Sequence, residues 1–231
     1  MHSLPLLTII ALVAFNYVDC QSFAAFPTAS NCETIPSTNA LGDGGQNEKQ
    51  KAVIEVEDGG SVANVVFGPN AADGIHCKGS CTLTNVWWTN VGEDAATFRG
   101  GANTKVVVDG GGAKSASDKT FQHNGGGSVT IKNFQCIDCG KVYRACGNCE
   151  TPYKRTVTLS NVKVTNLGST FVGINANYGD TATISKLIMV GSKKPVCETF
   201  QGTTDNNKEP PKDKVPNPKN CLNKPSDVTY Q

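Results

Sequence analysis

Short runs in which apolar and polar residues alternate recur through the middle of the chain, separated by glycine, asparagine or aspartate. β-Branched residues dominate these runs, and the two-residue period is that of a strand with one buried face. The runs are Val62–Phe67, Thr82–Trp88, Lys105–Val108, Val129–Phe134, Val157–Val164 and Ala182–Val190. Helical periodicity is hard to find, and the 24 glycines discourage long helices. The pattern predicts an all-β protein.

Comparable asparagines in these runs lie one structural repeat apart. Asn64 and Asn85 are separated by 21 residues, and Asn133 and Asn161 by 28. These spacings fit one coil of a right-handed parallel β-helix, a single-domain solenoid in which each coil stacks on the last. Within Val157–Val164 the apolar face changes after Asn161, as expected where a strand bends at a coil corner. An antiparallel β-sandwich, whose strands look locally alike, is the alternative fold.

The first twenty residues have the pattern of a targeting segment. Leu4–Val18 is an apolar run of about fifteen residues, which is too short to span a bilayer. Val18 and Cys20 are small enough for cleavage before Gln21. We therefore expect residues 1–20 to be a signal peptide and the mature protein to be secreted and extracellular.

Composition limits the partners of the mature chain. Cleavage removes Asp19 and no Lys or Arg, so 21 cations face 19 anions and the net charge is about +2. A nearly neutral chain is a poor nucleic-acid binder, and no later apolar run has membrane length. We expect a monomer with one β-helix domain over residues 21–202. An irregular Lys/Pro-rich segment, residues 203–231, is expected to pack on that domain.

Ten cysteines behind a signal peptide indicate disulfides formed in an oxidising compartment. The spacing suggests the pairs Cys77/Cys81, Cys136/Cys139, Cys146/Cys149 and Cys197/Cys221. The two C-x-x-C pairs also match a four-thiolate zinc pattern, which export disfavours. Cleavage after Cys20 leaves nine cysteines, so Cys32 or another would be free.

Three acidic residues lie about one repeat apart, with a cation close behind them. Asp73 is followed after one coil length by Glu93 and Asp94, and then by Arg99. Carboxylate oxygens suit a hard cation such as Ca²⁺, and a nearby base could act on a substrate that the metal holds. The alternative is that Asp73 and Asp94 only make hydrogen bonds within turns.

The sequence around these acids is similar to a known family. Ala71–Cys77 reads AADGIHC and Trp88–Ala95 reads WTNVGEDA. Both resemble the secreted pectate lyases of polysaccharide lyase family three, found in microbes and plant-parasitic nematodes. The resemblance, which spans Thr38–Gly202, implies a parallel β-helix and calcium-dependent β-elimination of de-esterified polygalacturonate in plant cell walls. It also implies that Asp73, Glu93 and Asp94 bind calcium. Asn90 stands where the family has a further acid, and its amide oxygen is expected to be a fourth, uncharged ligand.

The same resemblance assigns roles to several cations. Arg99 stands where the family places a lysine that is a leading candidate for the base, although a guanidinium holds its proton more firmly. Lys119 lies in a D-K-T-F-Q run, and Lys141 and Arg144 lie in G-K-V-Y-R. Lys119 is the second candidate base, whereas Lys141 and Arg144 would bind substrate carboxylates, and Arg144 would also act in catalysis by stabilising the transition state. Glu48 matches a family acid and is expected to assist substrate binding from the first coil.

Two other functional classes are compatible with parts of the pattern. A polygalacturonase-like hydrolase needs two carboxylates placed as acid and base, but neighbouring Glu93 and Asp94 would diverge on a strand. A catalytically inactive pectin-binding protein could have kept the fold and metal site, and the departures at Asn90 and Arg99 favour it. Trp87 and Trp88 should point to opposite faces of a strand, one into the core and the other free to stack on a sugar.

Overall fold

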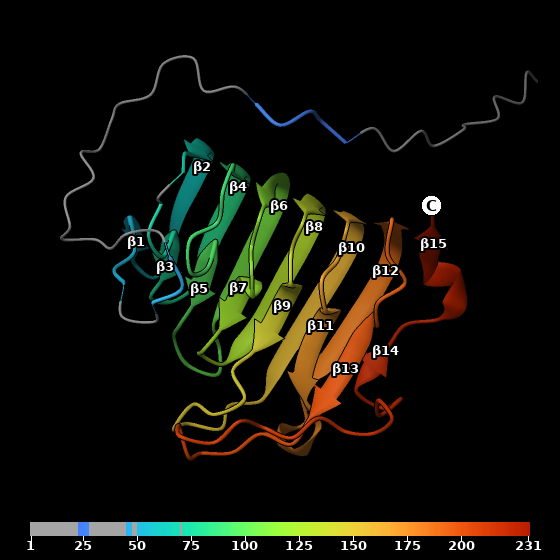
Figure 1. Cartoon of the computed structure of the whole chain (residues 1–231). Coiled ribbons are helices and arrows are strands. Elements are labelled where there is room, and N and C mark those ends of the chain that lie inside the picture. Colours follow the sequence, from blue (N-terminus) through green and yellow to red (C-terminus); the bar gives the residue numbers. More distant parts are fainter. Residues whose placement is uncertain (1–22, 28–44, 48–49, 70) are drawn as a thin grey trace, which may run out of the picture.

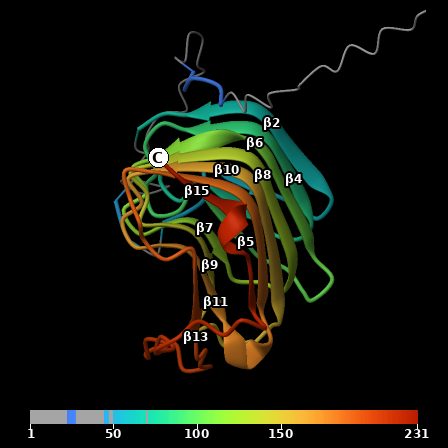
Figure 2. The same cartoon turned by 90° about the vertical axis from the view of Figure 1, so that its right-hand side faces the viewer.

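The computed structural model of the chain describes residues 23–27, 45–47, 50–69 and 71–231. The expected signal peptide, Cys32 and Glu48 lie outside these described residues. The described part forms stacked coils, each contributing one strand to each of two parallel sheets (Figures 1 and 2). Among these residues, no helix is long and apolar enough to cross a membrane.

The two sheets differ in the length of their strands. Sheet A consists of β1 (Ile54–Val56), β3 (Ile75–Cys77), β5 (Ala96–Phe98), β7 (Lys119–His123), β9 (Lys141–Ala145), β11 (Thr170–Asn175) and β13 (Cys197–Phe200). Sheet B consists of β2 (Gly60–Phe67), β4 (Cys81–Trp88), β6 (Lys105–Lys114), β8 (Gly127–Ile137), β10 (Arg155–Thr165), β12 (Thr181–Val190) and β14 (Cys221–Leu222), and β15 (Val228–Tyr230) also pairs with β12. Single turns of 3₁₀ helix occur at η1 (Ala176–Tyr178) and η2 (Pro225–Asp227).

Every strand pair in both sheets is parallel, which confirms the β-helix and excludes the antiparallel sandwich. All six alternating runs lie in sheet B, and the sequence pattern did not reveal the strands of sheet A. The runs were also predicted too short, most of all Lys105–Val108. β6 continues beyond Val108 through Gly110–Gly112, where Gly111 has a φ of 99° and a Cβ would lie 1.9 Å from the Val86 oxygen. Such a close approach of two backbones requires glycine.

The repeated asparagines turn the strands of sheet B at one corner of the coil. Asn64, Asn85, Asn133 and Asn161 all have φ between 52° and 58°, the left-handed region that asparagine tolerates better than most residues. Their side chains form hydrogen bonds between coils: Asn85 donates to Asn64, and Asn161 to Asn133, both at 2.8 Å. This corner explains the spacing seen in the sequence. It also explains the phase change in β10, whose apolar residues are buried on both sides of Asn161.

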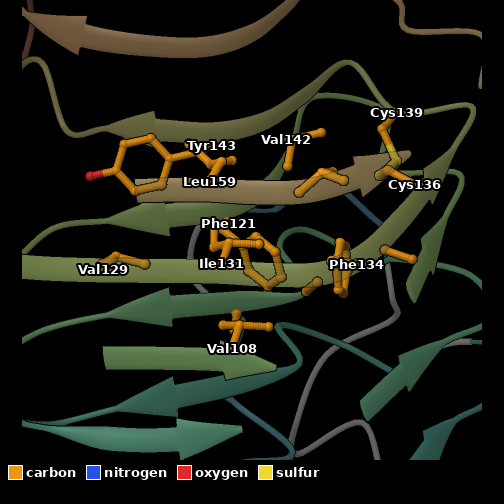
Figure 3. Close-up of a cluster of buried hydrophobic side chains, with 14 of the residues drawn as sticks. Val108, Phe121, Val129, Ile131, Phe134, Cys136, Cys139, Val142, Tyr143 and Leu159 are labelled. Atoms are coloured by element: carbon orange, nitrogen blue, oxygen red, sulfur yellow. A yellow bond between two sulfur atoms is a disulfide. The ribbon is translucent and has the colours of Figure 1, made fainter. Parts of the chain in front are cut away.

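The core lies between the two sheets. Val108, Ile131 and Leu159 occupy equivalent positions of β6, β8 and β10 and stack directly on one another. Phe121 and Tyr143, in register on sheet A, belong to the same cluster (Figure 3). These side chains are fully buried, so truncating one to alanine should cost about 2–5 kcal/mol of stability. The stacked core therefore provides a rigid support for the outward-facing residues of sheet A.

The two ends of the described chain pack on sheet B. Phe26 stacks edge-on against Trp87 at 4.9 Å, so Trp87 is covered by this chain instead of facing a sugar. Trp88 is completely buried, as predicted for one member of the pair. At the other end, β14 and β15 extend the edge of β12. The C-terminal segment, expected to be irregular, thus contains two short strands.

The four predicted disulfides are all present: Cys77–Cys81, Cys136–Cys139, Cys146–Cys149 and Cys197–Cys221. The two C-x-x-C pairs are each closed on themselves, so they are not arranged as the alternative zinc site. The last bridge ties the end of sheet A to β14.

Candidate functional site

Three buried carboxylates meet where two successive coils enter sheet A. Asp73 lies in the turn before β3, and Glu93 and Asp94 lie in the turn before β5. Between them, Gly74 has a φ of 40°, and a Cβ there would lie 2.0 Å from the Ala95 oxygen. Only glycine lets the two turns approach so closely. One oxygen from each carboxylate lies within 4.8 Å of the others, and the residues are only 2–5% exposed.

The electrostatics of this acidic cluster (Asp73, Glu93 and Asp94) favour a bound cation. Burial raises the pKa of Asp94, and the carboxylates of Glu93 and Asp73 add to that rise against the opposing charge of Lys119. Among the residues described, Asp73 Oδ1 and Asp94 Oδ1 are buried without a hydrogen-bond partner. Buried acceptors normally have partners, and calcium is bound by oxygen ligands of this kind. The donor set therefore fits Ca²⁺.

Two further residues close in sequence to the acidic cluster are His76 and Asn90. The His76 Nε2 atom is hydrogen-bonded to Asp73 Oδ2, so the histidine orients this carboxylate. Asn90 is exposed on the bend after β4. In the described part of the chain its side chain makes no hydrogen bond to the three acids, and its proposed role as a ligand stays a prediction.

Lys119, at the start of β7, is held among carboxylates. Its Nζ lies 3.3 Å from Glu93 Oε1, 3.9 Å from Asp94 Oδ1 and 2.8 Å from Asp118 Oδ2. Burial by itself would lower the pKa of this amine, but the neighbouring carboxylates, Asp94 first, outweigh burial and raise it. Asp118 also pairs with Lys141 on the next strand. Lys119 in this position is the counter-ion of these carboxylates, and its role as a base stays a prediction.

A groove of about 910 Å³ runs across sheet A beside the acidic cluster. All four candidate cations line it: Arg99, Lys119, Lys141 and Arg144. They come from three successive strands or their ends, and Lys119 and Lys141 are direct register partners. The structure thus brings together the cations that the sequence analysis singled out, on the face that also carries the acids.

The two arginines of the groove have different surroundings. Arg99 is exposed just after β5, whereas Arg144 on β9 is half-buried, with its guanidinium carbon 3.7 Å from the centre of the Phe200 ring. Burial lowers the pKa of Arg144 to about 10, against the opposing charges of Asp180 and Glu209. Its Nη1 atom is buried and has no hydrogen-bond partner among the described residues. An arginine in this state is suited to an incoming anion.

A buried cation below the groove was missed by the sequence analysis. Arg155, at the start of β10, is 1% exposed. Its guanidinium donates to the backbone oxygens of Asn124, Gly125, Cys146 and Tyr153, which belong to loops lining the groove. Arg155 therefore fixes the groove floor. A charged residue at the start of an alternating run looks like a surface residue, so no signal in the sequence distinguished it.

The comparisons with known proteins point to one family. The family whose sequence profile matches the chain is described as pectate lyase, and the match covers residues 29–207. A probable pectate lyase E of Neosartorya fischeri is 49% identical over 170 residues, covering 73% of this chain and 66% of the relative. A probable pectate lyase D of Emericella nidulans is 42% identical over 215 residues, 85% of this chain and 81% of the relative. The chain thus spans slightly less than two thirds of the first relative.

Solved structures agree with this result. Pectate lyase Pel3 of Pectobacterium carotovorum is similar with a TM-score of 0.71 and 31% identity, over 80% of this chain and 60% of that one. Pectate lyase PelI of Erwinia chrysanthemi, solved in complex with tetragalacturonic acid, matches with a TM-score of 0.63 and 29% identity. That match covers 76% of this chain and 71% of the other.

Proposed function

Since the chain belongs to the pectate lyase family, we propose that it is a secreted, calcium-dependent lyase that cleaves de-esterified polygalacturonate by β-elimination. The observation that carries this proposal is the groove of Arg99, Lys119, Lys141 and Arg144 next to the acidic cluster. A polyanion and a divalent cation are the ligands that such a surface would attract together. The PelI complex with tetragalacturonic acid supports the choice of substrate class.

The reaction removes a weakly acidic proton. A base takes the proton from C5 of a galacturonate unit, a double bond forms between C4 and C5, and the C4–oxygen bond breaks. The departing oxygen then gains a proton. Negative charge builds up on the carboxylate beside C5 during proton removal, so cationic groups held at that carboxylate stabilise the transition state. When bound, calcium would neutralise this carboxylate as a Lewis acid.

Each of the chain's own residues has a part in this proposal. Asp73, Glu93 and Asp94 would hold the metal, and Lys119 would balance part of their charge. Lys141 and Arg99 would bind galacturonate carboxylates along the groove. The sequence favoured Arg99 as the base, but Arg144 lines the same groove with its guanidinium held 3.7 Å from the centre of the Phe200 ring, and burial lowers its pKa to about 10. We therefore assign the base to Arg144.

One assay separates this proposal from the two alternatives. Polygalacturonate is incubated with the purified protein while ultraviolet absorbance of the unsaturated product and the number of reducing ends are followed. A calcium-dependent lyase produces both signals, loses both with a chelator and regains both when calcium is restored. Reducing ends without absorbance would show a hydrolase. Binding of the polymer with neither signal would show an inactive pectin-binding protein.

A further inference from the structure

Arg144 reaches across a neighbouring strand because that strand has no side chain in its path. On sheet A, Arg144 is in register with Gln122 of β7 and Gly173 of β11. A Cβ at Gly173 would lie 3.1 Å from both Cδ and Nη1 of Arg144, and 3.2 Å from Cε2 of Phe200. The absence of a side chain at residue 173 therefore allows the arginine of β9 to extend over β11 and meet the phenylalanine at the end of β13.

The guanidinium of Arg144 is enclosed on two sides. The ring of Phe200 lies 3.7 Å from its central carbon, and a Cβ at Gly147 would lie 2.7 Å from its Nη2 atom. A cation over an aromatic ring is attracted by the negative face of the ring, more strongly where water is excluded. The enclosed Nη1 has no hydrogen-bond partner in the part of the chain that the structure describes. The side chain is therefore held by the ring and by the close approach of the two glycines, and not by a hydrogen bond from Nη1.

The C-terminal segment in turn holds Phe200. Phe200 forms an antiparallel bridge with Lys212, and Gln201 donates its backbone N–H to the Pro211 oxygen at 2.9 Å. On the adjacent face, Pro210 packs against Gly147, with its Cγ 2.3 Å from where a Cβ would stand. The family match ends at residue 207, so these contacts come from a part of the chain beyond it.

We propose that Phe200, backed by the segment from Pro210 to Asp213, is a positioning residue that holds the guanidinium of Arg144 against the substrate. This inference rests on the proposed function of the same groove. The aromatic face lies along one side of the guanidinium, and the absence of side chains at Gly147 and Gly173 leaves the space that the guanidinium occupies. Most of the entropy of a long side chain is then lost before substrate arrives, which leaves less to lose in the transition state.

The test replaces the ring and keeps its apolar character. Phe200→Leu removes the aromatic face, and we expect kcat/KM on polygalacturonate to fall roughly two- to thirtyfold, the range of a cation–π contact at exposed to desolvated sites. Phe200→Tyr keeps the ring and should recover most of the loss. A comparable aromatic-to-leucine change outside the groove, Tyr230→Leu at a half-exposed residue of β15, is the control and should leave kcat/KM unchanged.

A double-mutant cycle distinguishes positioning from support of the fold. In an Arg144→Gln background, Phe200→Leu should have no further effect on kcat/KM, because the group that it positions is gone. If Phe200→Leu costs the same factor in both backgrounds, or if Phe200→Tyr is as impaired as Phe200→Leu, the inference is wrong. Thermal melting of each variant identifies any that fails to fold. Should the wild type show no lyase activity, affinity for a short oligogalacturonate replaces kcat/KM in the same cycle.

Discussion

Adding calcium to the metal-free protein should raise its melting temperature, because the acidic cluster is destabilising without a cation. Three carboxylates that are 2–5% exposed face one ammonium, that of Lys119, so the group carries a formal charge of −2. A divalent ion cancels this charge and would be bound by Asp73 Oδ1 and Asp94 Oδ1, which have no hydrogen-bond partner among the described residues. Calcium then binds the folded state in preference to the unfolded chain.

The size of the effect follows from linkage. At a calcium concentration 100 times the dissociation constant, binding stabilises the fold by about 2.7 kcal/mol. For a domain of this size each kcal/mol is worth roughly 2–4 °C, so the melting temperature should rise by about 5–11 °C. If loss of one carboxylate weakens binding about 100-fold, the same calcium contributes only about 0.4 kcal/mol, or roughly 1 °C.

The assay is thermal melting followed by circular dichroism, with excess chelator or with added calcium. Asp94→Asn is the test variant. Its metal-free form should melt no lower than the metal-free wild type, because the substitution relieves a buried repulsion. Asp109→Asn is the matched control, since Asp109 lies on sheet B in an ion pair with Lys132, and its calcium shift should equal that of the wild type.

Two outcomes would contradict the assignment of the acidic cluster as a calcium site. If Asp94 only makes hydrogen bonds within its turn, Asp94→Asn lowers the metal-free melting temperature and leaves the calcium shift intact. If calcium fails to shift the wild type at all, the acidic cluster is not a calcium site.

Three further measurements address the rest of the site and the fold. Arg144→Ala should lower kcat/KM by roughly 10²-fold or more, mainly through kcat, while Arg99→Ala should mainly raise KM. If kcat is unchanged in Arg144→Ala, Arg144 is not the base and Arg99 is the next candidate. Burial lowers the pKa of His123 from 6.5 to about 3, so the unfolded chain binds the extra proton between these values and stability should fall as pH drops through that window. His123→Gln should flatten this fall, and an equally steep fall in the variant would exclude His123 as its cause. Reduction of the disulfides, each worth about 2–5 kcal/mol in small domains, should lower the melting temperature without complete unfolding, and elemental analysis should find no stoichiometric zinc.

The sequence predicted the sheet that supports the site better than the sheet that carries it. Strands of sheet B are eight to eleven residues long from β2 to β12, long enough for alternation to be recognised. Strands β3 and β5 of sheet A have three residues each, fewer than two periods of alternation, and all of them are buried. Their positions could be inferred only from the motifs around Asp73 and Glu93, which the family resemblance supplied.

Other features could not be predicted because they depend on contacts between distant coils. The pairing of Lys119 with Glu93 spans 26 residues, and the contact of Arg144 with Phe200 requires a glycine on the strand between them. Arg155 is buried because carbonyls from two loops converge on it, which no periodicity records. Local spacing was sufficient for the four disulfides, and three of these close loops of only three or four residues.

Successive coils stack at the spacing of neighbouring strands, so side chains on successive coils are separated by a constant step of about 4.8 Å. Each functional group of the site belongs to a particular coil: the acids precede β3 and β5, Lys119 lies on β7, Arg144 on β9 and Phe200 on β13. Inserting or deleting one whole coil between β5 and β9 would change the distance between the acidic cluster and Arg144 by about 4.8 Å, which is more than a change of side-chain conformation could compensate. Lengthening a turn would leave the number of coils between the acidic cluster and Arg144 unchanged. Among relatives of this chain, differences in length should therefore collect in turns and at the two ends, and the number of coils between the acids and Arg144 should stay constant.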